Sequence, residues 1–161
     1  MSLIKNKKIL NLILLFSIVA IVTAYIIQYV LGHQPCNLCL IQRIPYIFSI
    51  IIVSVCLFTN KFEKIILIIL SLTFFVATLL SFYHFGIEQG FIKESLVCGL
   101  NISDNELTKE DLLNQLKKMP VSCRNVTFKI FGLSLATFNI FISLILSAIT
   151  MKLSLGYEKN K

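Results

Sequence analysis

Residues 65–85 read IILIILSLTFFVATLLSFYHF, and this segment contains no charged residue. It is almost purely apolar until Tyr83 and His84 near its end. About 20 apolar residues in a helix cross the roughly 30 Å hydrocarbon core of a bilayer. The segment is therefore predicted to be a membrane-spanning helix.

Three further apolar blocks predict three more spans, at about residues 9–31, 44–59 and 130–151. The first block follows a basic start, as in a signal peptide, but signal-peptide cores have only about 7–15 apolar residues. We therefore interpret it as a retained anchor. The second block is short, and it reaches spanning length only by including Leu40 and Ile41 or through a snorkelling lysine beyond its end.

The predicted fold is an all-α integral membrane protein, a bundle of four transmembrane helices. Residues 1–161 would form a single membrane domain with two outer loops, at about 32–43 and 86–129. The second loop contains a capping-box pattern at Thr108, and a short amphipathic helix is expected from there to Met119. This helix would lie on the membrane surface or on the end of the bundle.

The composition supports a membrane protein and argues against a nucleic-acid-binding protein. The chain is 57% hydrophobic and 14% charged, whereas soluble domains are about 25% charged. Its net charge of +7 is not gathered into a basic face with interleaved aromatic residues. The charges lie at the ends of the apolar blocks, where topology and lipid headgroups would place them. We expect membrane lipid as a partner, and no nucleic acid.

The charges also predict the orientation of the chain. Four spans put both termini and the short turn near residue 62 on one side of the membrane. That side carries eight basic and two acidic residues. The two other loops together carry seven basic and six acidic residues. By the positive-inside rule, the termini are cytoplasmic and the two loops lie outside.

Four of the five cysteines fall in the outer loops. Cys36 and Cys39 form a Cys-x-x-Cys motif in the first, and Cys98 and Cys123 lie in the second. The oxidising side of a membrane is where disulfide chemistry occurs. Cys56 lies inside the second span and is interpreted as a buried bystander, because an apolar site disfavours its thiolate.

The Cys-x-x-Cys pair has two chemical interpretations, and its spacing favours the first. Redox exchange needs only two thiols, a field that stabilises one thiolate, and an acceptor for the electrons. Zinc or iron–sulfur ligation needs four ligands at compact spacing, and neither loop offers a histidine cluster. The sequence thus predicts no metal site, with a metal-binding protein kept as the rival.

Arg43 follows Cys39 by four residues, which is one helical turn. A guanidinium at this position would lie beside the Cys39 thiolate at the membrane interface. The alternative is an interfacial arginine that anchors the end of the helix. Pro45 leaves a second choice open, since a helix could begin near Cys36 and kink or begin afresh at the proline.

The segment PCNLCLIQR at residues 35–43 resembles the DsbB family of membrane thiol oxidases. The resemblance extends to the order of four spans, the placement of both cysteine pairs and the segment YHFGIE at residues 83–88, and it covers nearly the whole chain.

The resemblance implies a function: reoxidation of a soluble periplasmic DsbA-like thiol oxidase, with transfer of electrons to a membrane quinone, ubiquinone or menaquinone. It places the protein in the bacterial inner membrane. Cys98, on an exposed loop, would meet the partner, and Cys123 would relay to Cys36. Cys39 would face the quinone.

Two further residues would belong to the quinone site on this resemblance. Arg43 would contact the quinone, and His84 would assist proton uptake, with a structural interfacial histidine as the alternative. From their loop placement and even number, we expect the four outer cysteines to form Cys36–Cys39 and Cys98–Cys123 disulfides in the resting protein. A purely structural protein with stapled loops is the other rival.

Overall fold

The computed structural model describes residues 2–59, 63–93, 98, 122–124, 129–130 and 132–158. Its elements in chain order are α1 (Ser2–Tyr29), α2 (Asn37–Ile41), α3 (Ile44–Thr59), α4 (Glu63–Glu88), β1 (Lys129–Ile130), β2 (Leu133–Ser134) and α6 (Leu135–Glu158). Four segments of these helices are long and apolar enough to cross a membrane: Lys7–Tyr29, Asn37–Thr59, Glu63–Glu88 and Leu135–Gly156. The predicted bundle of four transmembrane helices is confirmed.

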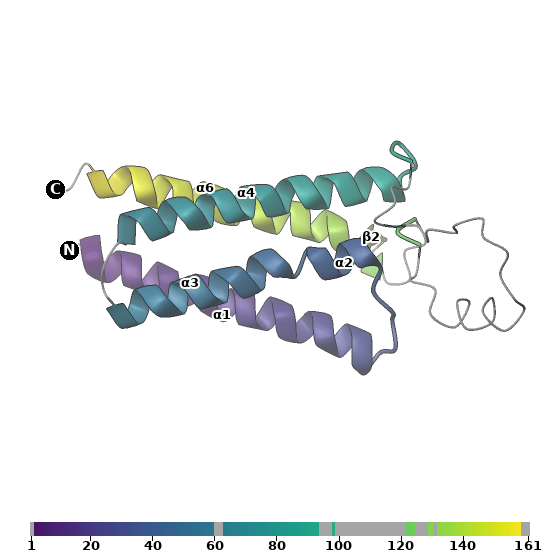
Figure 1. Cartoon of the computed structure of the whole chain (residues 1–161), viewed down its shortest axis with the longest axis horizontal. Coiled ribbons are helices and arrows are strands. Elements are labelled where there is room, and N and C mark those ends of the chain that lie inside the picture. Colours follow the sequence, from purple (N-terminus) through teal and green to yellow (C-terminus); the bar gives the residue numbers. More distant parts are fainter. Residues whose placement is uncertain are drawn as a thin grey trace, which may run out of the picture.

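The long helices run side by side as two pairs, with α4 along α6 and α1 along α3 (Figure 1). Contacts between α3 and α4 join the pairs. The start of α1 and the end of α6 lie at one end of the bundle, and α2 and β2 lie at the other. Four helices that run along one bundle in this way bring the start of α1 and the end of α6 to the same end.

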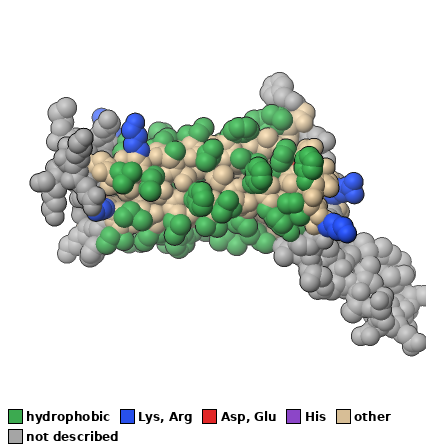
Figure 2. All heavy atoms as spheres, turned by 90° about the horizontal axis from the view of Figure 1, so that it is seen from above, with side chains coloured by type: hydrophobic (Ala, Val, Ile, Leu, Met, Phe, Trp, Pro, Cys, Tyr) green, Lys and Arg blue, Asp and Glu red, His purple; other side chains and the backbone are tan. Residues whose placement is uncertain are grey.

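The outer surface of the bundle is apolar, the reverse of a soluble protein. Phe58 is 88% exposed, and Leu72 and Phe141 are 63% and 60% exposed. Figure 2 shows hydrophobic side chains covering the middle of the bundle, with Lys and Arg side chains near its two ends. Such a surface is stable in lipid, which is as apolar as the side chains that face it.

Serines join the helices inside each pair. Ser71 donates to the carbonyl of Ser147 at 3.2 Å, and Ser147 donates to the carbonyl of Ser71 at 3.1 Å, which links α4 to α6 reciprocally. Between α1 and α3, the hydroxyls of Ser17 and Ser49 lie 2.9 Å apart. Small hydroxyl side chains let helix backbones approach closely and hydrogen bond where no water is available.

The fourth long helix begins later than expected, at Leu135 instead of about residue 130. The preceding residues form a short hairpin, in which Lys129 pairs with Ser134 and Ile130 with Leu133. Gly132 supplies the positive φ of 81° that the turn requires. The Ser134 hydroxyl then accepts the backbone N–H of Thr137 at 3.3 Å and caps the helix.

At Pro45 the structure shows a new helix and not a continuous, kinked one. α2 ends at Ile41, and α3 begins at Ile44 after a turn formed by Gln42 and Arg43. Proline lacks the N–H that would bond back to Ile41, so a continuous helix would lose that hydrogen bond. The amphipathic helix expected from Thr108 to Met119 lies outside the described residues.

Candidate active site

The cysteines of the two outer loops meet in one buried cluster at the α2 end of the bundle. Cys36, Cys98 and Cys123 pack there with Leu38 and Ile87, and Cys39 and Tyr83 pack against them. Cys36 is 5% exposed, and Cys98 and Cys123 are 2% exposed each. Cys98 is expected to meet a soluble partner from an exposed loop; its own side chain is buried here, and most of that loop lies outside the described residues.

The two cysteine pairs differ in how their sulfurs are joined. Cys98 and Cys123 form a disulfide with their Cα atoms 5.5 Å apart, as predicted. Cys36 and Cys39 are free thiols, and their sulfurs lie 2.8 Å apart in a hydrogen bond. A disulfide would bring them to about 2.05 Å. The structure therefore does not show the disulfide expected for this pair.

Cys36 is the N-cap of α2, which explains why both sulfurs lie on one side of this short helix. Its backbone is extended, with φ −71° and ψ 167°, and its sulfur accepts the backbone N–H of Cys39 at 3.3 Å. The N-terminal end of a helix leaves N–H groups free for such an acceptor. The spacing of three residues thus turns both sulfurs toward each other.

His84 reaches the same sulfur from α4. Its Nε2 lies 3.5 Å from the Cys36 sulfur and 3.6 Å from a carboxylate oxygen of Glu88, one turn further along the helix. The Cys36 pKa is lowered to about 4, chiefly by the hydrogen bond from the Cys39 thiol. Burial opposes this shift, and the hydrogen bond from His84 adds to it. Cys36 is therefore the sulfur of the pair that this site stabilises as a thiolate.

A chain of polar side chains continues from His84 into the bundle. The amide of Gln42 lies 3.1 Å from His84 Nδ1, and Asn139 of α6 donates to the Gln42 side-chain oxygen at 3.4 Å. Asn139 also donates to Ser81 at 2.7 Å and accepts from the Tyr46 hydroxyl. Polar residues inside membrane spans are candidates for a functional role, and Asn139 lies within a predicted span. Nothing in the sequence identified Gln42 as its partner.

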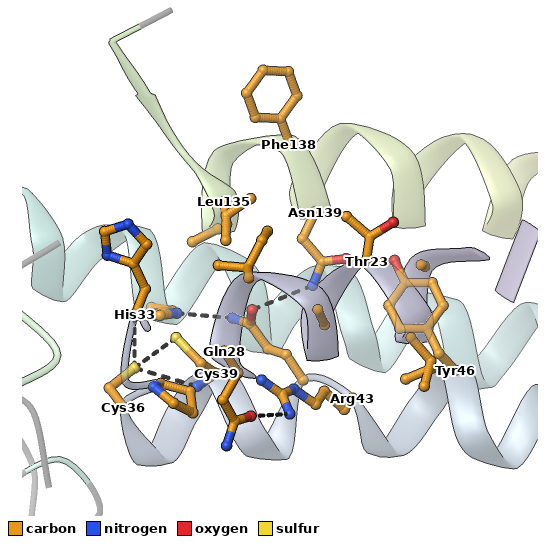
Figure 3. A pocket seen from close by; sticks show the side chains of 18 of the residues that line it. Thr23, Gln28, His33, Cys36, Cys39, Arg43, Tyr46, Leu135, Phe138 and Asn139 are labelled. Carbon is orange, nitrogen blue, oxygen red and sulfur yellow. Dashed lines mark hydrogen bonds between the residues drawn. The ribbon is translucent and has the colours of Figure 1, made fainter. Parts of the chain in front are cut away.

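A cavity of about 380 Å³ lies beside the thiols and is lined by Cys36, Cys39, Arg43 and His84. In the view of Figure 3, the two cysteines and Tyr46 lie at opposite sides, with Arg43 and Asn139 between them.

Apolar side chains form much of the rest of the cavity wall. Among them are Val19 of α1 and Leu135 of α6, which are also 52% and 39% exposed on the outer surface. The cavity wall therefore reaches the surface that faces lipid.

Arg43 has partners other than the expected thiolate. Its Nη1 donates to the Gln28 side-chain oxygen at 2.7 Å, and the guanidinium carbon lies 5.1 Å from the centre of the Tyr25 ring. Both partners belong to α1, so Arg43 ties the start of α3 to that helix. The sulfur of Cys36 receives its hydrogen bonds from Cys39 and His84 instead.

The residues of this cavity fit a quinone head group. A quinone has a flat apolar ring and two carbonyl oxygens that accept hydrogen bonds. The cavity offers apolar walls together with the guanidinium of Arg43 as a donor. The contact of its wall with the lipid-facing surface also suits a ligand that arrives from the bilayer.

The same residues have the composition of a metal site. Ligand atoms of Cys36, Cys39 and His84 all lie within 4.8 Å of one another. The sequence predicted no metal site because no histidine cluster lies near the cysteines along the chain. The fold brings His84 to them from the end of α4, at a distance in sequence that spacing rules do not cover.

Cys56 lies apart from this site, as expected of a bystander. It is a free thiol, 2% exposed, in the apolar core with Val53, Leu67 and Leu70.

Comparison with known proteins gives two matches. The family model of the disulfide bond formation protein DsbB matches residues 6–153. An uncharacterized protein of Rickettsia prowazekii (strain Madrid E) is 33% identical over 156 residues, which cover 95% of this chain and 90% of that protein. No solved structure matches the chain.

Proposed function

The chain belongs to the DsbB family of disulfide bond formation proteins, and we propose that it reoxidises a soluble DsbA-like thiol oxidase and passes the electrons to a membrane quinone. Membership of this family makes it a multi-pass membrane protein with an oxidoreductase role in disulfide formation. The soluble partner, the quinone and the direction of transfer are the parts that we propose.

One observation carries the proposal: Cys36 packs in the same buried cluster as Cys98 and Cys123. Thiol–disulfide exchange requires a sulfur to attack another sulfur directly. Two pairs that are far apart in sequence have been brought within one cluster, where such an exchange needs only small movements.

The proposed relay moves one pair of electrons through two thiol–disulfide exchanges and a final oxidation by the quinone. Two thiols of the reduced partner become a disulfide while the Cys98–Cys123 disulfide becomes two thiols. These two thiols then return to a disulfide while a Cys36–Cys39 disulfide is reduced. Oxidation of Cys36 and Cys39 finally releases two electrons and two protons.

Each cysteine has a proposed role in this sequence. Cys98 meets the partner, Cys123 passes the electrons to Cys36, and Cys39 faces the quinone. Because Cys98 is buried in the described state, the first exchange requires its sulfur to move out of the cluster.

The cavity beside the thiols would hold the quinone, which accepts two electrons and two protons when bound. Arg43 would donate a hydrogen bond to a quinone oxygen. His84 would hold or move a proton beside Cys36, since its Nε2 already faces that sulfur at 3.5 Å. The apolar walls would keep water away from the ring.

The proposed location is the bacterial inner membrane, with both termini in the cytoplasm and the cysteine cluster on the periplasmic side. The excess of basic residues near the termini supports this orientation. The periplasm is also the compartment in which disulfides form and persist.

A single assay tests the proposal: thiol oxidation by the purified protein, with a reduced DsbA-like protein as donor and with or without a soluble quinone. We expect oxidation of the donor only when quinone is present, with one quinone reduced for each disulfide formed. The proposal would be rejected if the donor were oxidised equally with and without quinone. It would also be rejected if neither ubiquinone nor menaquinone analogues supported oxidation of the donor.

A resident metal centre is the second candidate function, favoured by the cluster of Cys36, Cys39 and His84. It predicts stoichiometric zinc or copper in the protein as purified and no quinone-dependent oxidation of thiols. A purely structural protein predicts disulfides that never exchange with a soluble thiol. The assay above separates both from the proposed function.

A further inference from the structure

We propose that the reduced Cys36–Cys39 pair, together with His84, forms a redox-gated binding site for a thiophilic divalent cation such as Zn²⁺. The observation behind it is the convergence of three donor groups at the end of the cavity. Two thiols and an imidazole meet there from two helices, with their ligand atoms all within 4.8 Å of one another. This set includes the ligand types that zinc prefers in proteins.

The distances suit a tetrahedral ion after one small movement. Zinc bonds of about 2.3 Å to sulfur and about 2.0 Å to nitrogen place a sulfur and a nitrogen about 3.6 Å apart and two sulfurs about 3.8 Å apart. The Cys36 sulfur and His84 Nε2 are already 3.5 Å apart. The two sulfurs, now 2.8 Å apart, must separate by about 1 Å, which rotation about the Cys39 side chain can provide.

Three protein ligands leave the fourth position of a tetrahedral ion for a water molecule. The carboxylate of Glu88 flanks the site, with an oxygen 3.6 Å from His84 Nε2. A cation at this position would offset the negative charge of the two thiolates. All three ligand residues line the cavity, so the ion has a route to the site.

Gln42 would then act as the supporting partner of the ligand histidine. In the described state its amide nitrogen faces His84 Nδ1 at 3.1 Å, so the ring proton lies on Nε2. Metal binding needs the lone pair of Nε2, which moves the ring proton to Nδ1. A half-turn of the Gln42 amide presents its oxygen to that proton. Such outer partners typically change metal affinity by about 10- to 100-fold.

The site exists in only one redox state of the protein. A Cys36–Cys39 disulfide has no thiolates to bind an ion, whereas the reduced pair releases its protons on binding, with no change in oxidation state. Under the proposed function, a bound ion would hold both sulfurs and stop their oxidation. Ion binding itself does not depend on that function, because it requires only the two reduced thiols and His84.

The test is Zn²⁺ binding to the full-length protein in detergent, measured by competition with a chromophoric chelator, with Co²⁺ absorption to count thiolate ligands. We expect one ion per chain after reduction and none after oxidation. The Cys98→Ser/Cys123→Ser double variant and Cys56→Ser should bind as the wild type does. Cys36→Ser, Cys39→Ser and His84→Ala should lose most of the affinity, and Gln42→Met should weaken it by about 10-fold or more.

Binding that persists in Cys36→Ser and His84→Ala, or that is equal in the oxidised protein, would overturn the inference. Loss of binding in Cys98→Ser/Cys123→Ser would assign the ion to the other pair and overturn it as well. Helix content measured by circular dichroism shows that each variant is folded. Quinone-dependent turnover in excess chelator tests the proposed function separately, so either idea can fail while the other stands.

Discussion

The side-chain amide nitrogen of Gln42 lies 3.1 Å from Nδ1 of His84. An amide nitrogen only donates, so Nδ1 must accept and the proton of the neutral ring must lie on Nε2. Nε2 faces the Cys36 sulfur at 3.5 Å. Asn139 holds Gln42 in this orientation by donating to its side-chain oxygen at 3.4 Å. A residue of α6 thus influences which hydrogen bond reaches the sulfur.

Replacement of Gln42 by methionine tests this relationship. Gln42→Met keeps the length of the side chain but removes the donor to Nδ1, so the ring is free to take either tautomer. One buried hydrogen bond is worth about 0.5–1.5 kcal/mol, which corresponds to a roughly 2- to 13-fold fall in quinone-dependent turnover. Ring-nitrogen chemical shifts of labelled His84 should move away from the Nε2–H form. Unchanged shifts would show that Gln42 does not set the tautomer.

Asn139 should contribute to both stability and activity. It bonds to Gln42, Ser81, Ser143 and Tyr46, and Asn139→Leu leaves these partners without it. Unpaired buried polar groups cost about 1–3 kcal/mol, so we expect a loss of that size in unfolding measured in mixed micelles, together with slower turnover.

The control for Asn139 is Thr73→Val on α4. Thr73 is a partly exposed residue whose hydroxyl donates to the carbonyl of Ile69 in its own helix at 2.8 Å. The Thr73→Val variant should have the same unfolding stability and the same quinone-dependent turnover as the wild type. If Asn139→Leu matched this control in both measurements, the polar chain would have no role in either.

Sequence patterns predict the spans well because a long apolar run in a helix has few alternatives in lipid. They do not predict features that depend on a local turn or on contacts between residues far apart in the sequence. Because of the hairpin at Gly132, the last helix begins later in the chain than predicted. Nothing in the apolar pattern of residues 130–134 indicates this hairpin. The cysteine pairs were found from their spacing, whereas Glu88 and Gln42 were not assigned to the site. Glu88 and Gln42 lie near the cysteines only because α4 packs against the segment that follows α2.

The two cysteine pairs should fail in different ways. Cys39→Ser should abolish transfer to quinone while the Cys98–Cys123 disulfide still accepts electrons once from a reduced partner. Cys98→Ser should block that first step. Rapid mixing with a reduced partner, followed by alkylation and mass analysis, would show one round of partner oxidation in Cys39→Ser and none in Cys98→Ser. Steady-state turnover in both variants would exclude the relay.

The last prediction concerns Arg43, which we expect to govern use of the quinone. Its guanidinium lines the cavity and is held by Gln28 and Tyr25, a placement that leaves other N–H groups of the planar fork to donate to a carbonyl oxygen. Hydrogen bonds to charged groups are worth about 1.5–3 kcal/mol, so Arg43→Ala should weaken quinone affinity or turnover by roughly 10- to 150-fold. Arg43→Lys keeps the charge but loses the fork, so part of this loss should remain.

An anchoring role for Arg43 predicts another result, since the bond to Gln28 also joins α3 to α1. Gln28→Leu separates the two roles, because it removes the α1 partner and leaves the guanidinium in place. If Arg43 acts on the quinone, Gln28→Leu should change quinone kinetics much less than Arg43→Ala does, with similar amounts of inserted protein in both. If Arg43 is an anchor, both variants should insert poorly and the surviving protein should show normal quinone kinetics. Membrane-inserted protein and quinone-dependent turnover, measured side by side for Arg43→Ala, Arg43→Lys and Gln28→Leu, decide between them.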